Sequence, residues 1–314
     1  MAQLRSFDAA EVAALAPMHE AVVALRNCFA HRPSHIARQA HAVAGGEFLL
    51  MPAVDANAAG VKLIMVQPKN AERGLPIIQG TYVLFDADAG HAIALLDGAA
   101  LTTVRTPAIS AVATDGLARA DARTLGIIGS GPQAFGHIQA MLCVRPGLDE
   151  IVLASRTRAN AQALVDDLIA RSVLPPGVSI RVGSYAEAAG CDIVCTGTRA
   201  TEPIIDASMV RPGTHINAVG AYRTDMRELT TDLVAASRVI VDDIDAAHHE
   251  AGDLALAVAD GGWSWDRVVG DLAAVASGTV RRQSDTEITF FKSVGLAVQD
   301  LVIARHVCAA AGLL

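Results

Sequence analysis

The feature that most constrains the fold of this chain is a glycine-rich turn directly after a short apolar run. Residues 125–128 predict a buried strand, the turn Gly129-Ser130-Gly131-Pro132-Gln133-Ala134 follows, and the amphipathic stretch 133–144 predicts a helix. In G-x-G-x-x-A, the first glycine permits a tight turn and the second lets backbone N–H groups approach a phosphate. The small third residue lets the helix pack closely, with its positive end toward the anion. The pattern therefore predicts a site for a dinucleotide pyrophosphate.

A second predicted strand, residues 151–154, completes the β-α-β unit and ends in Ser155-Arg156-Thr157. NAD-specific proteins usually carry an acidic residue at this point, which binds the ribose 2′-hydroxyl. Arg156 instead offers a guanidinium, and its two neighbours offer hydroxyls, a set that suits a 2′-phosphate. We expect NADP(H) to be preferred and NAD(H) to be the alternative cofactor. The competing interpretation of Arg156 is a solvated loop arginine.

The order of predicted elements gives an α/β fold: a Rossmann-type doubly wound parallel sheet plus a second α+β domain. Residues 6–30 predict a helix with Asp8 as its cap. Four segments with turns between them predict an antiparallel sheet: 48–51, 60–67, 81–86 and 92–96. A helix is expected over 101–117, and an apolar helix over 295–311 that returns to the first domain. The parallel sheet is expected to continue through 179–182, 193–196, 215–219 and 239–241.

Composition narrows the class of partner. The net charge of −8 argues against nucleic acid and anionic membranes. No leader pattern and no run of 18 apolar residues occurs, so a soluble cytoplasmic protein without a membrane partner is expected. Cys191 and Cys195 are predicted to be buried thiols in a reducing compartment. His248 and His249 are adjacent rather than four residues apart, which indicates a helix surface and no metal site.

Several motifs together resemble the ornithine cyclodeaminase/mu-crystallin family. They are Lys62, Arg105-Thr106, the turn from Gly129 to Ala134, Ile216-Asn217-Ala218-Val219-Gly220, Arg227-Glu228-Leu229 and Lys292-Ser293-Val294-Gly295. The resemblance implies a homodimer with a substrate-binding and dimerisation domain, residues 1–117 plus 291–314. It also implies an NAD(P)-binding Rossmann domain, residues 118–290, with the substrate in the cleft between the two domains.

The resemblance assigns catalytic and substrate-binding roles to Lys62, Arg105 and Arg38. A planar arginine fork can hold both oxygens of an α-imino acid carboxylate, and a lysine can supply a charge or a proton. On strand alternation alone, Lys62 is equally an outward-facing lysine, and Arg105 is alternatively a structural arginine at a helix start. The cofactor-binding set adds Thr196, Thr198 and Val219, with Ser293 and Gly295 at the nicotinamide.

Two departures from the family pattern concern acids expected near a diamine substrate. Leu49 stands two residues before Met51-Pro52, and Tyr222 stands two residues after Gly220, each where the family has an acid. Tyr222 cannot act as a carboxylate at neutral pH, because the ordinary pKa of tyrosine is about 10. Asp225 and Glu228 are nearby; they are interpreted either as a surface helix start with an ion pair to Arg227 or as site residues.

Three functions follow. The first is an oxidoreductase that uses NAD(P)H to reduce a small cyclic or linear imino acid, such as Δ1-pyrroline-2-carboxylate, to the amino acid. The second is ornithine cyclodeamination to proline and ammonia with catalytic NAD+, which Leu49, Tyr222 and Arg156 disfavour. The third is a noncatalytic NADPH-dependent binder of a small ligand, which the cations Arg38, Lys62 and Arg105 disfavour because a pure binder does not need a carboxylate clamp.

Overall fold

The computed structural model describes residues 4–314, which separate into two compact units. Unit 1 contains residues up to Thr106 and the segment Leu296–Leu314, and unit 2 is Pro107–Gly295. The first break lies inside helix α3 (Gly98–Leu117), at Pro107, which has no N–H to donate to the preceding turn. The sequence analysis placed the domain boundaries at 117/118 and 290/291.

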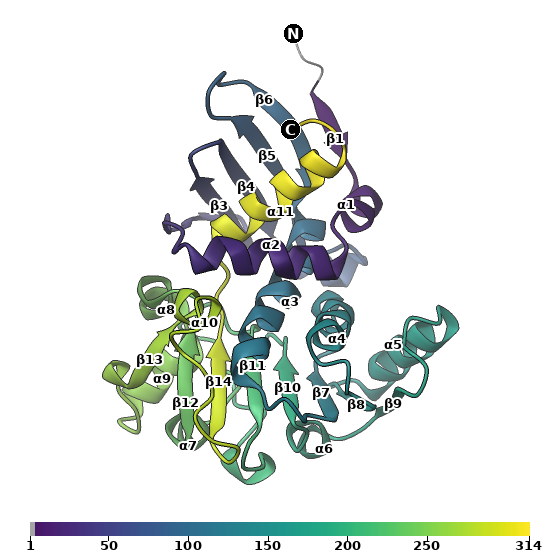
Figure 1. The fold of residues 1–314 in the computed structure, drawn as a ribbon, viewed down its shortest axis with the longest axis vertical. Coiled ribbons are helices and arrows are strands. Elements are labelled where there is room, and N and C mark those ends of the chain that lie inside the picture. Colours follow the sequence, from purple (N-terminus) through teal and green to yellow (C-terminus); the bar gives the residue numbers. More distant parts are fainter. Residues whose placement is uncertain (1–3) are drawn as a thin grey trace. The chain divides into compact units, whose positions relative to one another are not determined.

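Unit 1 is built on a six-stranded sheet with the order β1-β6-β5-β4-β3-β2 (Figure 1). All neighbouring pairs are antiparallel except β1 and β6, which are parallel. The four predicted strands are present, and β1 and β2 extend the sheet at its edges. The strands are β1 (Arg5–Phe7), β2 (Gln39–Val43), β3 (Gly46–Val54), β4 (Ala58–Val66), β5 (Ile78–Asp86) and β6 (Ala92–Asp97).

Helices α1 (Ala9–Leu15), α2 (Met18–Ala30) and α11 (Ala297–Ala310) complete unit 1. The C-terminal helix α11 contacts β3, β4, β5 and α2, so the last segment returns to the first unit as expected (Figure 1). The prediction of one helix over residues 6–30 was wrong, because Pro17 separates α1 from α2. Asp8 is confirmed as the N-cap of α1, in a capping box with Glu11.

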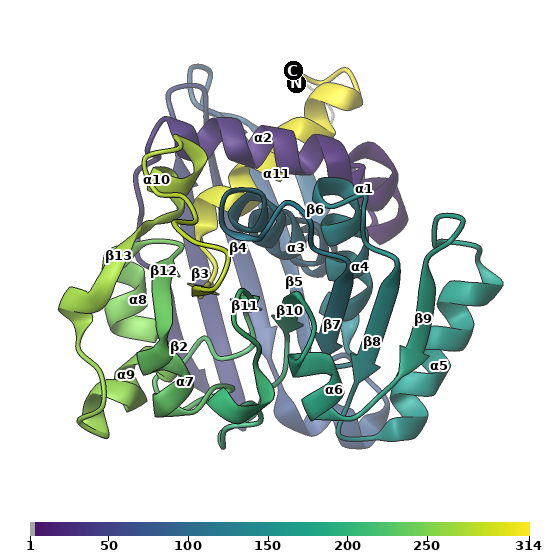
Figure 2. The same cartoon turned by 60° about the horizontal axis from the view of Figure 1, so that its bottom comes forward.

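Unit 2 is built on an eight-stranded parallel sheet with the order β13-β12-β14-β11-β10-β7-β8-β9 (Figure 2). The switch in strand order lies between β7 and β10, on either side of which the chain winds outward. Strand β14 inserts between β11 and β12, out of chain order. The strands are β7 (Thr124–Ile128), β8 (Glu150–Ala154), β9 (Ser179–Val182), β10 (Ile193–Thr196), β11 (His215–Ala218), β12 (Ser237–Val241), β13 (Val268–Asp271) and β14 (Ile288–Lys292).

Seven further α-helices belong to unit 2, and α4 follows the glycine-rich turn directly. They are α4 (Pro132–Val144), α5 (Arg158–Ala170), α6 (Tyr185–Ala189), α7 (Thr231–Ala236), α8 (Ile244–Glu250), α9 (Gly252–Ala259) and α10 (Leu272–Ala276). His248 and His249 are exposed on α8, and Cys191 and Cys195 are buried, as expected. Among the residues from 4 onward, no helix is both long and apolar enough to cross a membrane. The predicted α/β class with a doubly wound parallel sheet is confirmed.

Candidate functional site

The glycine-rich turn joins β7 to α4, as the sequence predicts. Gly129 has φ +117°, and a Cβ there would lie 2.9 Å from the carbonyl oxygen of Gly197, so only glycine fits. Gly131 differs: its φ is −83°, and a Cβ would meet nothing within 4 Å. The protein's own packing therefore does not require glycine at 131. The open space above it suits a ligand that approaches the backbone at the start of α4, where Pro132 is the first residue.

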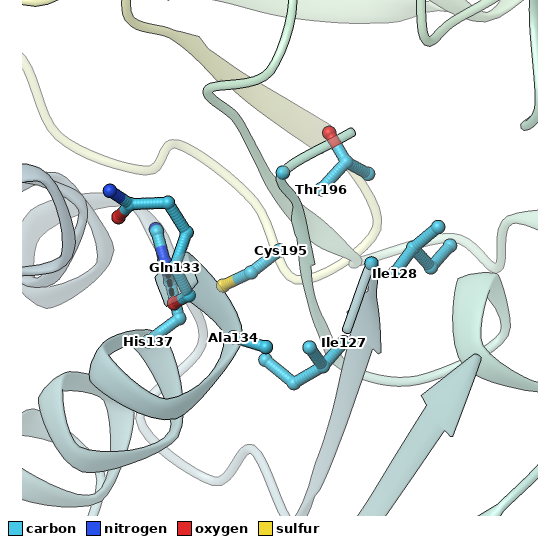
Figure 3. A pocket seen from close by; sticks show the side chains of 9 residues that line it. Ile127, Ile128, Gln133, Ala134, His137, Cys195 and Thr196 are labelled. Atoms are coloured by element: carbon cyan, nitrogen blue, oxygen red, sulfur yellow. Dashed lines mark hydrogen bonds between the residues drawn. The ribbon is translucent and has the colours of Figure 1, made fainter. Parts of the chain in front are cut away.

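A small pocket lies next to this turn, bordered by α4 and β10 (Figure 3). Figure 3 shows Gln133 and His137 on α4, with Cys195 pointing toward that helix from β10. The lining residues are Ile127, Ile128, Gly129, Gln133, Ala134, His137, Cys195, Thr196 and Gly197.

The polar groups of this pocket carry no charge at neutral pH. Burial lowers the pKa of His137 to about 4, and its ring is fixed between the Ser110 hydroxyl at 3.1 Å and the Gln133 carbonyl at 2.8 Å. Burial raises the pKa of the Cys195 thiol to about 12. A neutral imidazole and a neutral thiol therefore border the turn.

The end of β8 presents the residues predicted to select the cofactor. The Ser155 and Ser130 hydroxyls lie 2.9 Å apart, which links this strand end to the glycine-rich turn. Arg156 is exposed and Thr157 is the N-cap position of α5. Ser155, Arg156 and Thr157 therefore lie in one region of unit 2, next to the glycine-rich turn.

Thr196 and Thr198 stand at the end of β10, where both hydroxyls donate to Glu228. The distances to its carboxylate are 2.8 Å from Thr196 Oγ1 and 2.7 Å from Thr198 Oγ1. Glu228 is fully buried, so its interpretation as a surface helix start was wrong. Arg227 pairs with Asp260 instead, and the exposed Asp225 pairs with Arg223. Val219, half-buried, follows β11.

Ser293 and Gly295 follow β14 and are held by one buried carboxylate. Asp242 Oδ2 accepts from the Ser293 hydroxyl at 2.8 Å and from the N–H groups of Val294 and Gly295 at 2.9 and 2.8 Å. Gly295 has φ +83°. Asp242 thus fixes the segment that the family resemblance assigns to the nicotinamide.

In unit 1, Lys62 on β4 forms a fully buried ion pair with Asp300 on α11. Lys62 Nζ lies 2.7 Å from each carboxylate oxygen and donates to Thr102 Oγ1 at 3.1 Å. Neither side chain has exposed surface, so the outward-facing alternative for Lys62 was wrong. The pKa of Lys62 is lowered to about 7, mainly because the side chain is buried. The charge of Asp300 opposes this and raises the pKa, whereas the charges of Arg105 and Arg38 lower it.

Arg105 and Arg38 supply the other two cations of unit 1. Arg105 lies inside α3, not at a helix start, and donates through Nη1 to Gln299 Oε1 at 3.0 Å. Its Nε lies 3.8 Å from Asp300 Oδ1. Arg38 is half-buried in the segment between α2 and β2 and acts electrostatically on Lys62. Lys62 and Arg105 therefore both lie next to Asp300, and the charge of Arg38 acts on Lys62.

Leu49 lies on the same face of the sheet as Lys62. Met51 pairs directly with Lys62, and Leu49 is two residues away on β3, so alternation gives both the same side. Leu49 and Met51 are buried. A carboxylate at 49 would thus lie on the lysine face, where this chain has an apolar side chain. Tyr222 is half-buried in the loop after β11.

Sequence reasoning missed two fully buried polar residues of α11, Gln299 and Asp300. They interrupt the apolar first half of the helix, whereas Arg305 and His306 in its second half are half-buried. A buried acid in an apolar helix normally has a charged partner, and Lys62 equally interrupts an apolar strand. The sequence signal that could have predicted the Lys62–Asp300 pair is the presence of one opposite charge in each of these two apolar segments.

The fold and the turn define the class of Rossmann-type dinucleotide-binding proteins. The sequence profile described as "Ornithine cyclodeaminase/mu-crystallin family" matches residues 7–311, and this chain belongs to that family. The resemblance inferred from the sequence motifs is confirmed.

Several proteins similar to this chain are named as pyrroline-2-carboxylate or ketimine reductases. A Δ1-pyrroline-2-carboxylate reductase from Bacillus cereus is 38% identical over 262 residues, covering 82% of this chain and 79% of its own. The ketimine reductase mu-crystallin of Rattus norvegicus is 36% identical to this chain, over 82% of this chain and 78% of its own length. Among solved structures, Thermococcus litoralis Δ1-pyrroline-2-carboxylate reductase in complex with NADH and L-proline superposes with a TM-score of 0.92. Its sequence is 30% identical, and the match covers 98% of this chain and 97% of that chain.

Proposed function

We propose that this protein is an NAD(P)H-dependent reductase of small 2-imino acids, with Δ1-pyrroline-2-carboxylate as a representative substrate and proline as its product. The observation that carries the proposal is the buried Lys62–Asp300 pair beside Arg105 and Arg38. A lysine of this kind is rare in a strand core, because burying its charge is costly without a partner. The curated relatives named as imine and ketimine reductases support the same chemistry.

Arg38 and Arg105 offer guanidinium groups whose charges act on Lys62. A guanidinium can hold both oxygens of a substrate carboxylate. We assign carboxylate binding to Arg38 and Arg105.

We assign Lys62 the role of general acid, which donates a proton to the imine nitrogen. A general acid works best when its pKa lies near the operating pH, and the pKa of Lys62 is lowered to about 7. Asp300 and Thr102 fix the Nζ position. Lys62 therefore donates a proton to nitrogen or stabilises an iminium that already carries one.

Residues of unit 2 fit a dinucleotide. The empty space at the Cβ position of Gly131 provides room for a phosphate, which the α4 N-terminus favours electrostatically. Ser130, Gly131 and Pro132 would hold the pyrophosphate, and Ser293 and Gly295 would border the nicotinamide. When bound, the reduced cofactor supplies the hydride that the imine carbon accepts.

We assign NADPH as the preferred form because Arg156 is exposed where a 2′-hydroxyl acceptor would otherwise stand. One charge-assisted pair contributes about 1.5–3 kcal/mol, which corresponds to a preference on the order of tenfold or more. Arg156→Ala should lower kcat/KM for NADPH and leave that for NADH unchanged, so NADH serves as the internal control. Equal efficiency of the unmodified enzyme with both cofactors would contradict the assignment.

The proposed activity is tested by following nicotinamide absorbance with cyclic and linear 2-imino acids, and by chiral analysis of the product. Consumption of NADPH with stoichiometric proline from Δ1-pyrroline-2-carboxylate is the expected result. Proline and ammonia from ornithine without net cofactor consumption would instead identify a cyclodeaminase. Tight NADPH binding without turnover of any imino acid would identify a noncatalytic binder.

The unit 1 sheet also supports a homodimer. The side chains that alternate with the buried ones are apolar and half-exposed or exposed, including Phe48, Val54, Val61, Leu63, Met65 and Val83. Such a continuous apolar face suits a second copy of the same chain, and a similar archaeal alanine dehydrogenase is described as a dimer. Sedimentation should give a dimer, and the double variant Val54→Asp, Met65→Lys a monomer. A monomeric unmodified protein would contradict this assignment.

A further inference from the structure

Glu228 is a fully buried carboxylate that the proposed reaction does not use. It accepts four hydrogen bonds from the ends of two neighbouring strands. Oε1 accepts from the N–H and the hydroxyl of Thr198, both at 2.7 Å. Oε2 accepts from the Thr196 hydroxyl at 2.8 Å and from the Gly220 N–H at 2.9 Å. The carboxylate thus links the loop after β10 to the loop after β11.

An ionised carboxylate accepts all four of these hydrogen bonds, although burial and the charge of Asp253 raise the pKa of Glu228. Each oxygen faces one backbone N–H, and a backbone N–H can donate but never accept. A glutamine of the same shape would turn its NH2 group toward either Thr198 N–H or Gly220 N–H. The N–H group of that loop would then lose its acceptor and face the NH2 group of the glutamine, which is also a donor.

Unit 2 provides a second layer that holds Glu228 in place. Asp253 Oδ1 accepts from the N–H groups of Glu228 and Leu229 at 2.6 and 2.9 Å. Its other oxygen lies 2.9 Å from Lys292 Nζ, and both side chains of this pair are fully buried. The positive charge of Lys292 offsets part of the cost of burying two carboxylates.

The two linked loops lie at the carboxyl ends of parallel strands, the edge where such sheets bind ligands. Thr196 also lines the pocket next to the glycine-rich turn. We propose that Glu228 is a positioning residue for the dinucleotide: it holds the loops after β10 and β11 in the conformation that accepts the nicotinamide half. This inference rests on the proposed function only in its assumption that the ligand is a nicotinamide dinucleotide.

The arrangement also changes the role of the two threonines. A hydroxyl group can donate one hydrogen bond. The hydroxyls of Thr196 and Thr198 both donate theirs to the Glu228 carboxylate. Toward a ligand, these hydroxyls can therefore act only as acceptors.

Glu228→Gln is the direct test, and Asp192→Asn is its matched control. Asp192 Oδ2 also accepts two backbone N–H groups and a threonine hydroxyl, from Arg123 and Thr124, at 2.9, 3.0 and 3.0 Å. It lies before β10, at the amino ends of the strands and therefore at the opposite edge of the sheet. Both substitutions should lower the unfolding temperature of the free protein, but only Glu228→Gln should weaken NADPH binding, by about tenfold or more.

NADPH affinity is measured by fluorescence titration without substrate, well below the unfolding temperature of each variant. If Glu228→Gln does not fold, Thr196→Val, which removes one of the four bonds, should weaken binding by a smaller factor. Unchanged NADPH affinity in a folded Glu228→Gln, or equal weakening by Asp192→Asn, would overturn the positioning role. Absence of NADPH and NADH binding by the unmodified protein would instead overturn the proposed function. Normal binding without turnover would contradict the reductase and leave the Glu228 result valid.

Discussion

Lys62 illustrates how the surroundings of a residue determine its chemistry. Its position in an apolar strand left its orientation open, because alternation alone fits either face of a sheet. The structure buries it against Asp300, with Arg105 and Arg38 near enough to lower its pKa. Asp300 is 238 residues away along the chain, so no local pattern could predict the pair.

The pH dependence of turnover follows from this environment. A lysine is charged below its pKa, so a proton-donating Lys62 should lose function as the pH rises through about 7. In Asp300→Asn, the group that raises the Lys62 pKa is removed, and the decline in kcat should move to lower pH. The ionisation of the substrate is the same in both proteins and cancels in the comparison. A decline at the same pH in both would show that Lys62 is not the titrating group.

Ornithine should be a poor substrate, because Leu49 and Tyr222 provide no carboxylate for its distal ammonium. Desolvating an unpaired ammonium costs several kcal/mol, whereas burying its three methylenes returns only about 0.8 kcal/mol each. Proline and ammonia formation should therefore be at least about 100-fold slower than imine reduction. Comparable rates in a direct product assay would refute this, and Asp225 would become the candidate acid.

At the scale of elements, the terminal helix α11 is as important to unit 1 as the strands it covers. The sequence predicted an apolar helix that returns to the first domain, and the structure confirms it. Its buried Gln299-Asp300 pair holds Arg105 and Lys62 from α3 and β4. Strands β13 and β14 were not predicted. β13 has only two apolar side chains, Val268 and Val269, and the apolar run of β14 is too short to distinguish a strand from a buried helix segment.

The C-terminal end of α3 offers a stability test at this scale. Arg145 is buried and donates to the carbonyl groups of Thr114 and Asp115 in the last turn of α3 and to those of Ala118 and Arg119 just beyond it. Arg145→Met should destabilise the protein by about 2–4 kcal/mol, seen as a lower urea midpoint. Arg171→Met removes an exposed ion pair to Asp167 and a contact of the guanidinium with the Phe135 ring at 4.8 Å, and should cost about 1 kcal/mol or less. Equal effects would contradict the capping role.

At the scale of the whole molecule, the sequence predicted the fold class, the strand that carries the glycine-rich turn and the family. These depend on local signals: the turn, the apolar strand segments and the motif order. The buried networks around Asp300, Glu228 and Asp242 depend on contacts between distant segments, and the sequence alone could not place them. The misinterpretation of Glu228 has this cause, because its four donors come from loops that are not adjacent to it in the chain.

We assign proton transfer to unit 1 and dinucleotide binding to unit 2. Lys62→Met should reduce turnover by about 10²–10⁴-fold and leave NADPH affinity within about twofold. Gly131→Val should weaken NADPH binding by more than about tenfold, because its side chain fills the space for the phosphate. Its unfolding temperature without ligand should stay close to that of the unmodified protein, since a Cβ there meets no protein atom within 4 Å.

The most direct measurement is therefore an NADPH titration by fluorescence, run beside imine turnover, for these two variants. We expect opposite results: Lys62→Met binds NADPH normally and does not turn over the imine, and Gly131→Val is folded and binds NADPH poorly. Full activity of Lys62→Met, or normal NADPH affinity of Gly131→Val, would refute this division of roles between the two units.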